Sequence, residues 1–252
     1  MSTKYIYVMG SESGAGKSTV CLGILAHLLV SGYDPNRLAY IKPVTQCSEL
    51  QRVALFCEQT KIPYIDLGRL VFSKGFSRDF IDGLTKPTKS LMTDVLASIL
   101  ELGNDKDVVI IDGVGDPSVG SVVGVSNVDV ALSLPCHVIF VGKPGIGSAL
   151  DNTVLCVTFM QHKGLANIGV IYNKIAPSAL PEIKKYITKR LPELLPKIKL
   201  LGFISNEQLA ESQFKETVIK DIAHWFGSYL NLHFLLHDWL ELDLNYMPRQ
   251  VR

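Results

Sequence analysis

The residues best suited to chemistry in this sequence lie in a glycine-rich segment near the N-terminus, residues 10–18, which reads GSESGAGKS. The segment matches G-x-x-x-x-G-K-[ST], a spacing that lets a loop wrap its backbone N–H groups around phosphate oxygens. An apolar strand pattern precedes it and a helical pattern follows it, which is the context that the motif requires. We therefore predict a P-loop that binds a nucleoside triphosphate, ATP, together with Mg²⁺.

The side chains of this loop have distinct expected roles. Lys17 should reach the β- and γ-phosphates and take part in catalysis, while Ser18 should place its hydroxyl on Mg²⁺. Glu12 is unusual beside a triphosphate. It is either a solvated side chain or a catalytic residue that helps to hold Mg²⁺ or orients a cationic substrate. The residues expected to contact the nucleotide are Gly10, Ser13, Gly14, Ala15, Gly16, Lys17, Ser18 and Thr19.

Three more polar residues follow apolar runs that read as buried strands. Asp112 ends the run VVIID and is the expected second Mg²⁺ ligand, although a turn or cap aspartate is the alternative. Lys42 should point at phosphate or at an anionic intermediate as a catalytic cation, unless it is a surface lysine at a strand end. Asn173 offers a donor and an acceptor that suit the adenine edge, although it could also be a turn residue.

These residues need a scaffold of alternating strands and helices. Apolar runs at 5–9, 38–43, 108–112, 137–141, 168–172 and 199–204 predict strands, and helical periodicity appears at 19–31, 50–59, 91–102, 151–162, 181–191 and 219–229. Pro192 is expected to end the helix 181–191, and residues 71–89 form the longest irregular stretch. The alternation predicts an α/β fold with a doubly wound, mostly parallel sheet and helices on both faces.

Length and composition limit the alternatives. The 252 residues suit a single P-loop domain over residues 1–239 and a C-terminal arm over residues 240–252. Lys and Arg total 25 and Asp and Glu total 24, so charge gives no argument for nucleic acid or a membrane as partner. The sequence shows neither a signal-peptide pattern nor an apolar stretch of spanning length, and we expect a cytoplasmic protein.

The five cysteines predict no catalytic or metal site. No CxxC pair occurs, the number is odd and most neighbours are apolar, so reduced structural thiols are expected. Cys136 and His137 are adjacent within a strand pattern, and consecutive strand residues point to opposite faces of the sheet. They are therefore not expected to form a nucleophile–base pair.

The order of these motifs resembles dethiobiotin synthetase and the related ATP-binding module at the N-terminus of long phosphotransacetylases. The resemblance spans roughly residues 5–211. It rests on residues 10–19, IKPV at 41–44, IDGVG at 111–115, residues 137–147, QHKGL at 161–165, YNK at 172–174 and LGFI at 201–204. It implies a homodimer in which Lys17 and Lys42 stabilise phosphate and carbamate charge, Ser18 and Asp112 serve Mg²⁺, Glu12 matches an acidic loop position and Asn173 reads adenine.

The sequence also departs from the synthetase pattern. Gln46 stands where a Ser is usual and looks more like the phosphotransacetylase module, Asp112 replaces a Glu, and Glu49 is a poor substitute for a metal-binding Asp. Two functions therefore remain open. One is an ATP-dependent ligase that acts on an amine or carboxylate through a carbamate or acyl-phosphate intermediate. The other is a nucleotide-binding regulatory module with little turnover. A cobyrinate-type amidotransferase would need a partner protein, and a nucleoside or sugar kinase is possible from the P-loop alone.

Overall fold

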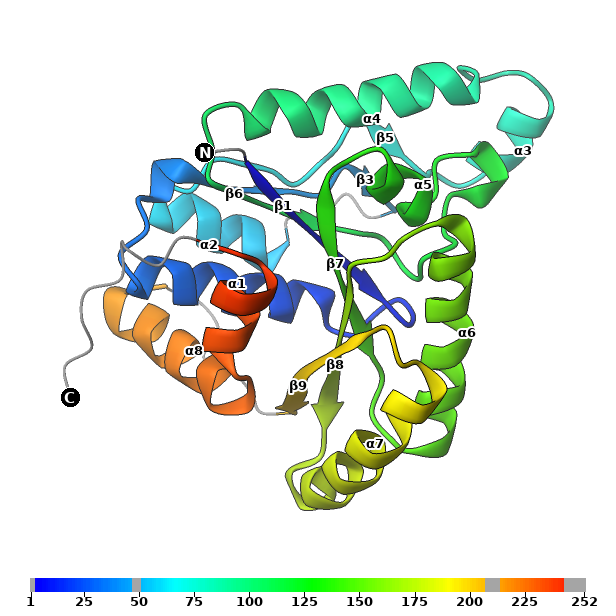
Figure 1. Cartoon of the computed structure of the whole chain (residues 1–252). Coiled ribbons are helices and arrows are strands. Elements are labelled where there is room, and N and C mark those ends of the chain that lie inside the picture. Colours follow the sequence, from blue (N-terminus) through cyan, green and yellow to red (C-terminus); the bar gives the residue numbers. More distant parts are fainter. Residues whose placement is uncertain (1–2, 47–50, 207–213, 243–252) are drawn as a thin grey trace.

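The computed structural model describes residues 3–46, 51–206 and 214–242. Its centre is a seven-stranded sheet in the order β4-β2-β6-β1-β7-β8-β9, in which each neighbouring pair of strands is parallel (Figure 1). The strands are β1 (Lys4–Gly10), β2 (Leu38–Ile41), β4 (Tyr64–Ile65), β6 (Val108–Asp112), β7 (Cys136–Gly142), β8 (Ile168–Ile175) and β9 (Lys199–Ser205). The predicted doubly wound parallel sheet is confirmed.

The helices cover both faces of this sheet (Figure 1). Their bounds are α1 (Lys17–Val30), α2 (Arg52–Thr60), α3 (Phe76–Ile81), α4 (Thr88–Gly103), α5 (Asn127–Leu132), α6 (Gly147–Lys163), α7 (Leu180–Leu194) and α8 (Glu216–Tyr229). Apolar side chains of α1, α2 and α8 pack on one face, and those of α4, α5, α6 and α7 pack on the other. Two cores result, one on each side of the sheet.

The side chains of strand β1 point alternately into the two cores. Tyr5, Tyr7 and Met9 belong to the core under α4 and α6, whereas Ile6 and Val8 belong to the core under α1 and α8. Both sets are buried, which explains the uninterrupted apolar run in the sequence, since a parallel strand covered on both faces has no solvent side. The central position of β1 fixes the loop that follows it at the point where the strand order reverses.

The same alternation separates Cys136 from His137 in β7. Cys136 packs against the core under α4 and α6, while the His137 ring lies 5.1 Å from the Trp239 ring on the other face. Cys21, Cys57, Cys136 and Cys156 are free thiols. The expectation that Cys136 and His137 do not form a pair is confirmed.

Close packing of α1 against α8 depends on one glycine. A Cβ on Gly23 would lie 2.2 Å from a carbon of the Phe226 ring, far inside contact distance. Phe226 is fully buried in this core. Helix α1, which begins with the last P-loop residues, is therefore held in place by its contact with α8.

The segment after α8 continues the core. A π-helix, η4 (Phe234–Trp239), buries Leu235 and Leu236. Leu240 and Leu242, within the segment expected to be an arm, are also buried in the core under α1 and α8. Residues 243–252 lie outside the described part of the chain.

The expected end of the helix at Pro192 is wrong. Helix α7 runs through Pro192 to Leu194, although proline removes one backbone donor. Leu191 and Leu195 flank it and are both buried, so the apolar stripe continues past the proline. Burial of that stripe outweighs one lost hydrogen bond near the helix end.

The expectation of an irregular stretch over residues 71–89 is also wrong in part. It contains the short helix α3 and the start of α4, and two two-residue strands, β3 (Val44–Thr45) and β5 (Leu70–Val71), pair in parallel beside it. Helix α5 was not predicted either. Both α3 and α5 have six residues, too few to show helical periodicity in a sequence.

None of the described helices combines the length and apolar character needed to cross a lipid bilayer.

Candidate functional site

The glycine-rich loop lies between β1 and α1, as its motif requires. β1 ends at Gly10, the Ser11 N–H donates to the Val141 carbonyl at 2.8 Å, and α1 begins at Lys17. Gly16 adopts the left-handed region with φ 93°, and a Cβ there would lie 2.0 Å from Nδ2 of Asn173. Only glycine satisfies both constraints, so the loop conformation follows directly from the motif.

Asp112 lies beneath the loop and is fully buried. Its Oδ2 accepts hydrogen bonds from the Ser18 hydroxyl and from the Tyr40 hydroxyl, both at 2.9 Å. Its Oδ1 is buried without a hydrogen-bond partner among the described residues. A buried carboxylate oxygen with no partner is costly unless a cation completes it.

This arrangement fits Mg²⁺. The hydroxyl of Ser18 and the free oxygen of Asp112 are hard oxygen ligands, which is the type that Mg²⁺ takes, and it binds through few protein groups while keeping waters and phosphate oxygens. The strand β6 sets the position of Asp112, and the first turn of α1 sets that of Ser18. The two predicted metal residues are therefore together in the fold.

Lys17 is buried in the loop, with its Nζ 3.3 Å from the Glu12 carbonyl oxygen. Burial lowers the pKa of Lys17, and the nearby Lys42 lowers it further, while Asp112 opposes both effects. A triphosphate bound in the loop would place negative charge beside this desolvated ammonium and so compensate for the cost of burying it.

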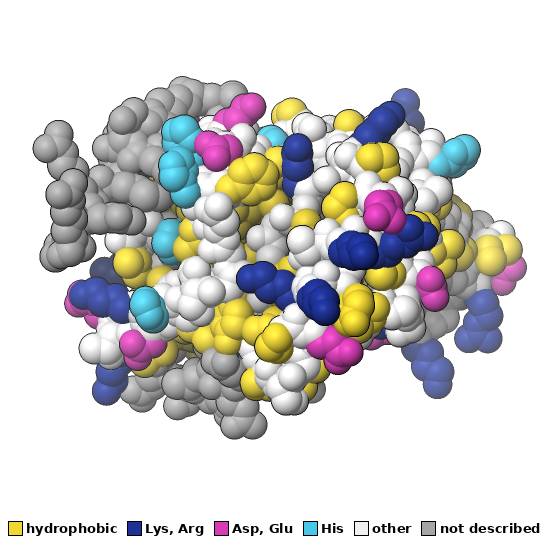
Figure 2. Space-filling view, turned by 60° about the horizontal axis from the view of Figure 1, so that its bottom comes forward, with side chains coloured by type: hydrophobic (Ala, Val, Ile, Leu, Met, Phe, Trp, Pro, Cys, Tyr) yellow, Lys and Arg dark blue, Asp and Glu magenta, His cyan; other side chains and the backbone are white. Residues whose placement is uncertain are grey.

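A pocket of about 320 Å³ opens over the loop. It is lined by Ser13, Gly14, Gly16, Lys17, Ser18, Thr19, Lys42, Thr45, Gln46, Gln51, Gly113, Val114, Gly115 and Lys174. Lys17, Lys42 and Lys174 give it three cationic side chains. Lys and Arg side chains also gather near the middle of one face of the molecule, although the chain as a whole is nearly neutral (Figure 2).

Lys42 follows β2 directly, because that strand ends at Ile41 and not at residue 43. Its N–H donates to the Ile65 carbonyl at 2.8 Å, which ties it to β4. The neighbouring Asp66 follows β4, and its Oδ2 accepts from the Gln51 N–H at 2.9 Å. Burial raises the pKa of Asp66, while the Gln51 bond and the charge of Lys42 oppose the shift.

Asn173 supports the loop from the end of β8. Its Nδ2 donates to the carbonyls of Ala15 and Gly16, both at 3.3 Å, and its Oδ1 accepts from the Lys174 N–H at 2.8 Å. The side chain is thus occupied with the loop, and contact with adenine stays a prediction. Lys174 has a left-handed φ of 59° and lines the pocket mouth beside Gly16.

Most of the predicted residues converge on the pocket, and a few do not line it. Ser13, Gly14, Gly16, Lys17, Ser18, Thr19 and Lys42 are among its lining residues. Gly10, Ala15 and Asn173 lie behind the loop surface, and Asp112 lies below it. Glu12 is exposed and contributes only its carbonyl to the contacts described, so its catalytic role stays a prediction. Glu49 lies outside the described residues.

Sequence reasoning did not single out Lys174, Gln51 or Asp66. Lys174 had a usable signal, since it directly follows Asn173 at a strand end. Asp66 had none, because the strand before it, β4, has only two residues and reaches the sheet by pairing with β2. Gln51 is the N-cap of α2 and follows no strand pattern.

We compared the chain with known protein families, curated proteins and solved structures. The family model described as AAA domain matches residues 4–222. No curated protein matches the sequence.

Similar solved structures include the MinD cell division protein of Aquifex aeolicus, with 13% identity, 97% of this chain and 94% of that chain covered and a TM-score of 0.49. The MinC:MinD cell division protein complex of the same organism gives 15% identity, 90% and 96% coverage and a TM-score of 0.50. At 15% identity the likeness to the MinC:MinD complex is one of fold alone. With the P-loop, the buried aspartate and the match over most of its length in agreement, the chain belongs to the AAA domain family of P-loop ATPases.

Proposed function

We propose that this protein is an ATP-dependent ligase that binds ATP with Mg²⁺ and transfers the γ-phosphoryl group to an oxygen of a small anionic substrate. One observation carries the proposal: Lys17, Lys42 and Lys174 line one pocket above the Ser18–Asp112 pair, and no Asp, Glu or His lines that pocket among the described residues. The pocket is built for negative charge.

Because the described lining residues include no carboxylate or imidazole that could act as a base, we favour a nucleophile that needs none. A neutral alcohol or amine must lose a proton as it attacks phosphorus, and a positioned base normally takes that proton. A carboxylate or a carbamate is already an anion and needs none. Its oxygen would form a bond to the γ-phosphorus while the bond from that phosphorus to the β–γ bridging oxygen breaks, releasing ADP and leaving a mixed anhydride. The nitrogen of an amine would then bond to the carbonyl carbon of the anhydride as the bond from that carbon to the phosphate oxygen breaks, and the departing phosphate would take up the proton that the amine loses.

The side chains divide this work. Lys17 and the loop N–H groups bind the phosphates, and Ser18 and Asp112 would hold Mg²⁺, whose charge would offset that of the β- and γ-oxygens. Lys42 lines the same pocket from the end of a different strand and would face charge that grows on the transferred group. A preorganised cation in a site screened from water stabilises such charge most in the transition state.

The decisive experiment measures phosphate release from ATP and Mg²⁺ in the presence of candidate substrates, beginning with diaminopelargonate and bicarbonate and continuing with small carboxylates plus ammonia. Lys42→Ala should keep most of the nucleotide affinity and lose roughly 10²–10³-fold in rate. Arg69→Ala, an exposed cation paired with Glu101, is the control and should leave the rate unchanged. Normal turnover in Lys42→Ala would refute the role assigned to this lysine, whereas failure of every substrate to stimulate phosphate release by the unmodified protein would refute the ligase assignment.

Nucleotide binding itself is tested at Lys17. Lys17→Ala removes a buried charge from the phosphates, and a charge-assisted contact of this kind is worth roughly 1.5–3 kcal/mol, a tenfold to hundredfold loss of affinity. Calorimetric titration with ATP and Mg²⁺ measures it. Unchanged affinity would show that the loop does not bind the nucleotide through this lysine.

A regulatory nucleotide-binding module is the second candidate. Gln46 and Gln51, both neutral, line the pocket near Lys42, and Gln46 is the residue that resembles the phosphotransacetylase module. This function predicts tight binding of ATP with no substrate that stimulates hydrolysis. The resemblance also implies a homodimer, which light scattering with and without nucleotide would test.

A further inference from the structure

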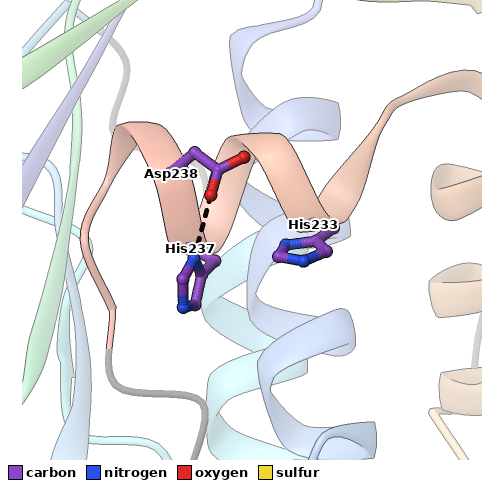
Figure 3. Close-up of side chains that lie close together, drawn as sticks. All are labelled: His233, His237 and Asp238. Carbon is purple, nitrogen blue, oxygen red and sulfur yellow. Dashed lines mark hydrogen bonds and ion pairs between the residues drawn. The ribbon is translucent and has the colours of Figure 1, made fainter.

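A second cluster of chemically active side chains lies away from the nucleotide pocket, around the π-helix η4. His233 precedes η4, and His237 and Asp238 lie within it (Figure 3). All three side chains are exposed, and one potential ligand atom from each lies within 4.8 Å of the others. From this geometry we infer a surface site for a transition-metal ion of the Zn²⁺ type, held by His233, His237 and Asp238.

The distances support a single ion. With ligand bonds of about 2.0–2.2 Å, the ligand atoms of a tetrahedral zinc site are about 3.4 Å apart. Nδ1 of His237 and Oδ1 of Asp238 are 2.9 Å apart in a hydrogen bond that the ion would replace, and the rings of His233 and His237 are 5.0 Å apart between centroids. Because both imidazoles are exposed, their side chains can change rotamer, and the proposed site requires such a change to bring the remaining ligand atom into range.

The ligand types select the metal class. Two imidazoles and one carboxylate suit Zn²⁺ and neighbouring ions such as Ni²⁺ and Cu²⁺, whereas Mg²⁺ prefers oxygen ligands alone. Three protein ligands leave a fourth position open to water. The chemistry therefore differs from that of the Ser18–Asp112 pair, and the two sites should not compete for the same ion.

The backbone presents the cluster on one side of a packed element. Leu235, Leu236 and Trp239 face the core, so the same helix that is anchored by these residues carries the ligands on its outer side. The four-residue spacing of His233 and His237 places them above one another on a helical surface. Single-turn π-helical segments are rare and frequently occur at functional sites.

The site is tested by calorimetric titration of tag-free, nucleotide-free protein with Zn²⁺ after removal of bound metal by a chelator. We expect one Zn²⁺ per chain. Loss of outer partners alone weakens metal sites by about 10–100-fold, so His237→Ala and His233→Ala should each cost at least as much. Asp238→Asn keeps the volume of the side chain and should also weaken binding.

The matched control is His224→Ala, which removes an exposed histidine of the neighbouring helix α8 outside the cluster. It should bind Zn²⁺ like the unmodified chain. Thermal melting without metal verifies that each variant is folded, and added Zn²⁺ should raise the melting temperature only where the cluster is intact. Absence of binding, or binding that survives both histidine substitutions, would overturn the inference.

Discussion

Two buried polar side chains at the carboxyl end of the sheet, Asp112 and Asn127, are satisfied to different degrees. The Asn127 Oδ1 accepts from the Tyr7 hydroxyl at 3.1 Å and from the Val114 N–H at 3.2 Å. Its Nδ2 donates to the carbonyls of Val114 and Asp116 at 2.7 and 2.6 Å. Asp112 instead accepts from two hydroxyls on one oxygen, and no group in the described part of the chain donates to the other.

This difference separates a side chain that stabilises the fold from one that we expect to bind a ligand. A polar group whose donors and acceptors are all paired stabilises the fold, and here Asn127 shapes the segment after β6 that lines the pocket with Gly113, Val114 and Gly115. A buried carboxylate with an unpaired oxygen costs free energy, and a bound cation would offset that cost. Asn127 should therefore matter for stability, and Asp112 for ligand binding.

The largest effect is expected for Asn127→Ala. The substitution leaves the Val114 N–H and the Tyr7 hydroxyl buried without an acceptor, at about 1–3 kcal/mol for each group. We expect the free energy of unfolding to fall by roughly 2–6 kcal/mol in total. Denaturant unfolding measures it, with the exposed Asn167→Ala as control. A change no larger than in the control would abolish the contrast with Asp112.

Asp112→Asn comes next. It should weaken nucleotide binding in the presence of Mg²⁺ by roughly tenfold to hundredfold, the worth of one charge-assisted contact, and much less in a chelator. The free energy of unfolding should change little, because the amide retains the volume and still accepts from Ser18 and Tyr40. Titrations with and without Mg²⁺ decide the point. Equal losses in both would make Asp112 a structural residue like Asn127.

The smallest effect concerns Asp129, which lies two residues after Asn127 at the start of α5. Burial raises the pKa of Asp129, but hydrogen bonds from Ser126 and the charge of Lys163 outweigh it and lower the pKa below its usual 3.8. Asp129→Asn keeps an oxygen that can accept from the Ser126 N–H but removes the charge and the ion pair with Lys163, and should reduce the free energy of unfolding by about 1 kcal/mol at neutral pH.

This contribution depends on pH with a defined sign. Because the folded pKa is below the unfolded one, the stabilisation is complete above the unfolded pKa and disappears as the pH falls through the folded pKa. The difference between the native chain and Asp129→Asn should therefore shrink below about pH 4. Asp221→Asn, an exposed carboxylate on α8, serves as control. A difference that stays constant down to the lowest pH would contradict the assigned charge.

Sequence patterns predicted the secondary structure correctly where a long strand or helix, or a motif, produces a recognisable pattern within a few consecutive residues. The six longer strands and the P-loop are recognisable because apolar runs and glycine spacing act over a few consecutive residues. The short elements α3, α5, β3, β4 and β5 are not, since their residues form structure only through contacts with distant parts of the chain. Pro192 illustrates the reverse case, in which burial of Leu191 and Leu195 outweighs a strong local signal.

The sequence alone determined the fold class and the P-loop, and it singled out Lys17, Ser18, Lys42 and Asp112 as the proposed site, because the chemistry of each is tied to a local pattern. Only the tertiary structure decided which oxygen of Asp112 has no partner among the residues it describes, that Asn173 donates hydrogen bonds to the loop, and that Lys174 and Gln51 line the same pocket. These facts depend on distances between side chains brought together by parallel strand pairing. Such distances are set by packing across the whole sheet, which no local spacing encodes.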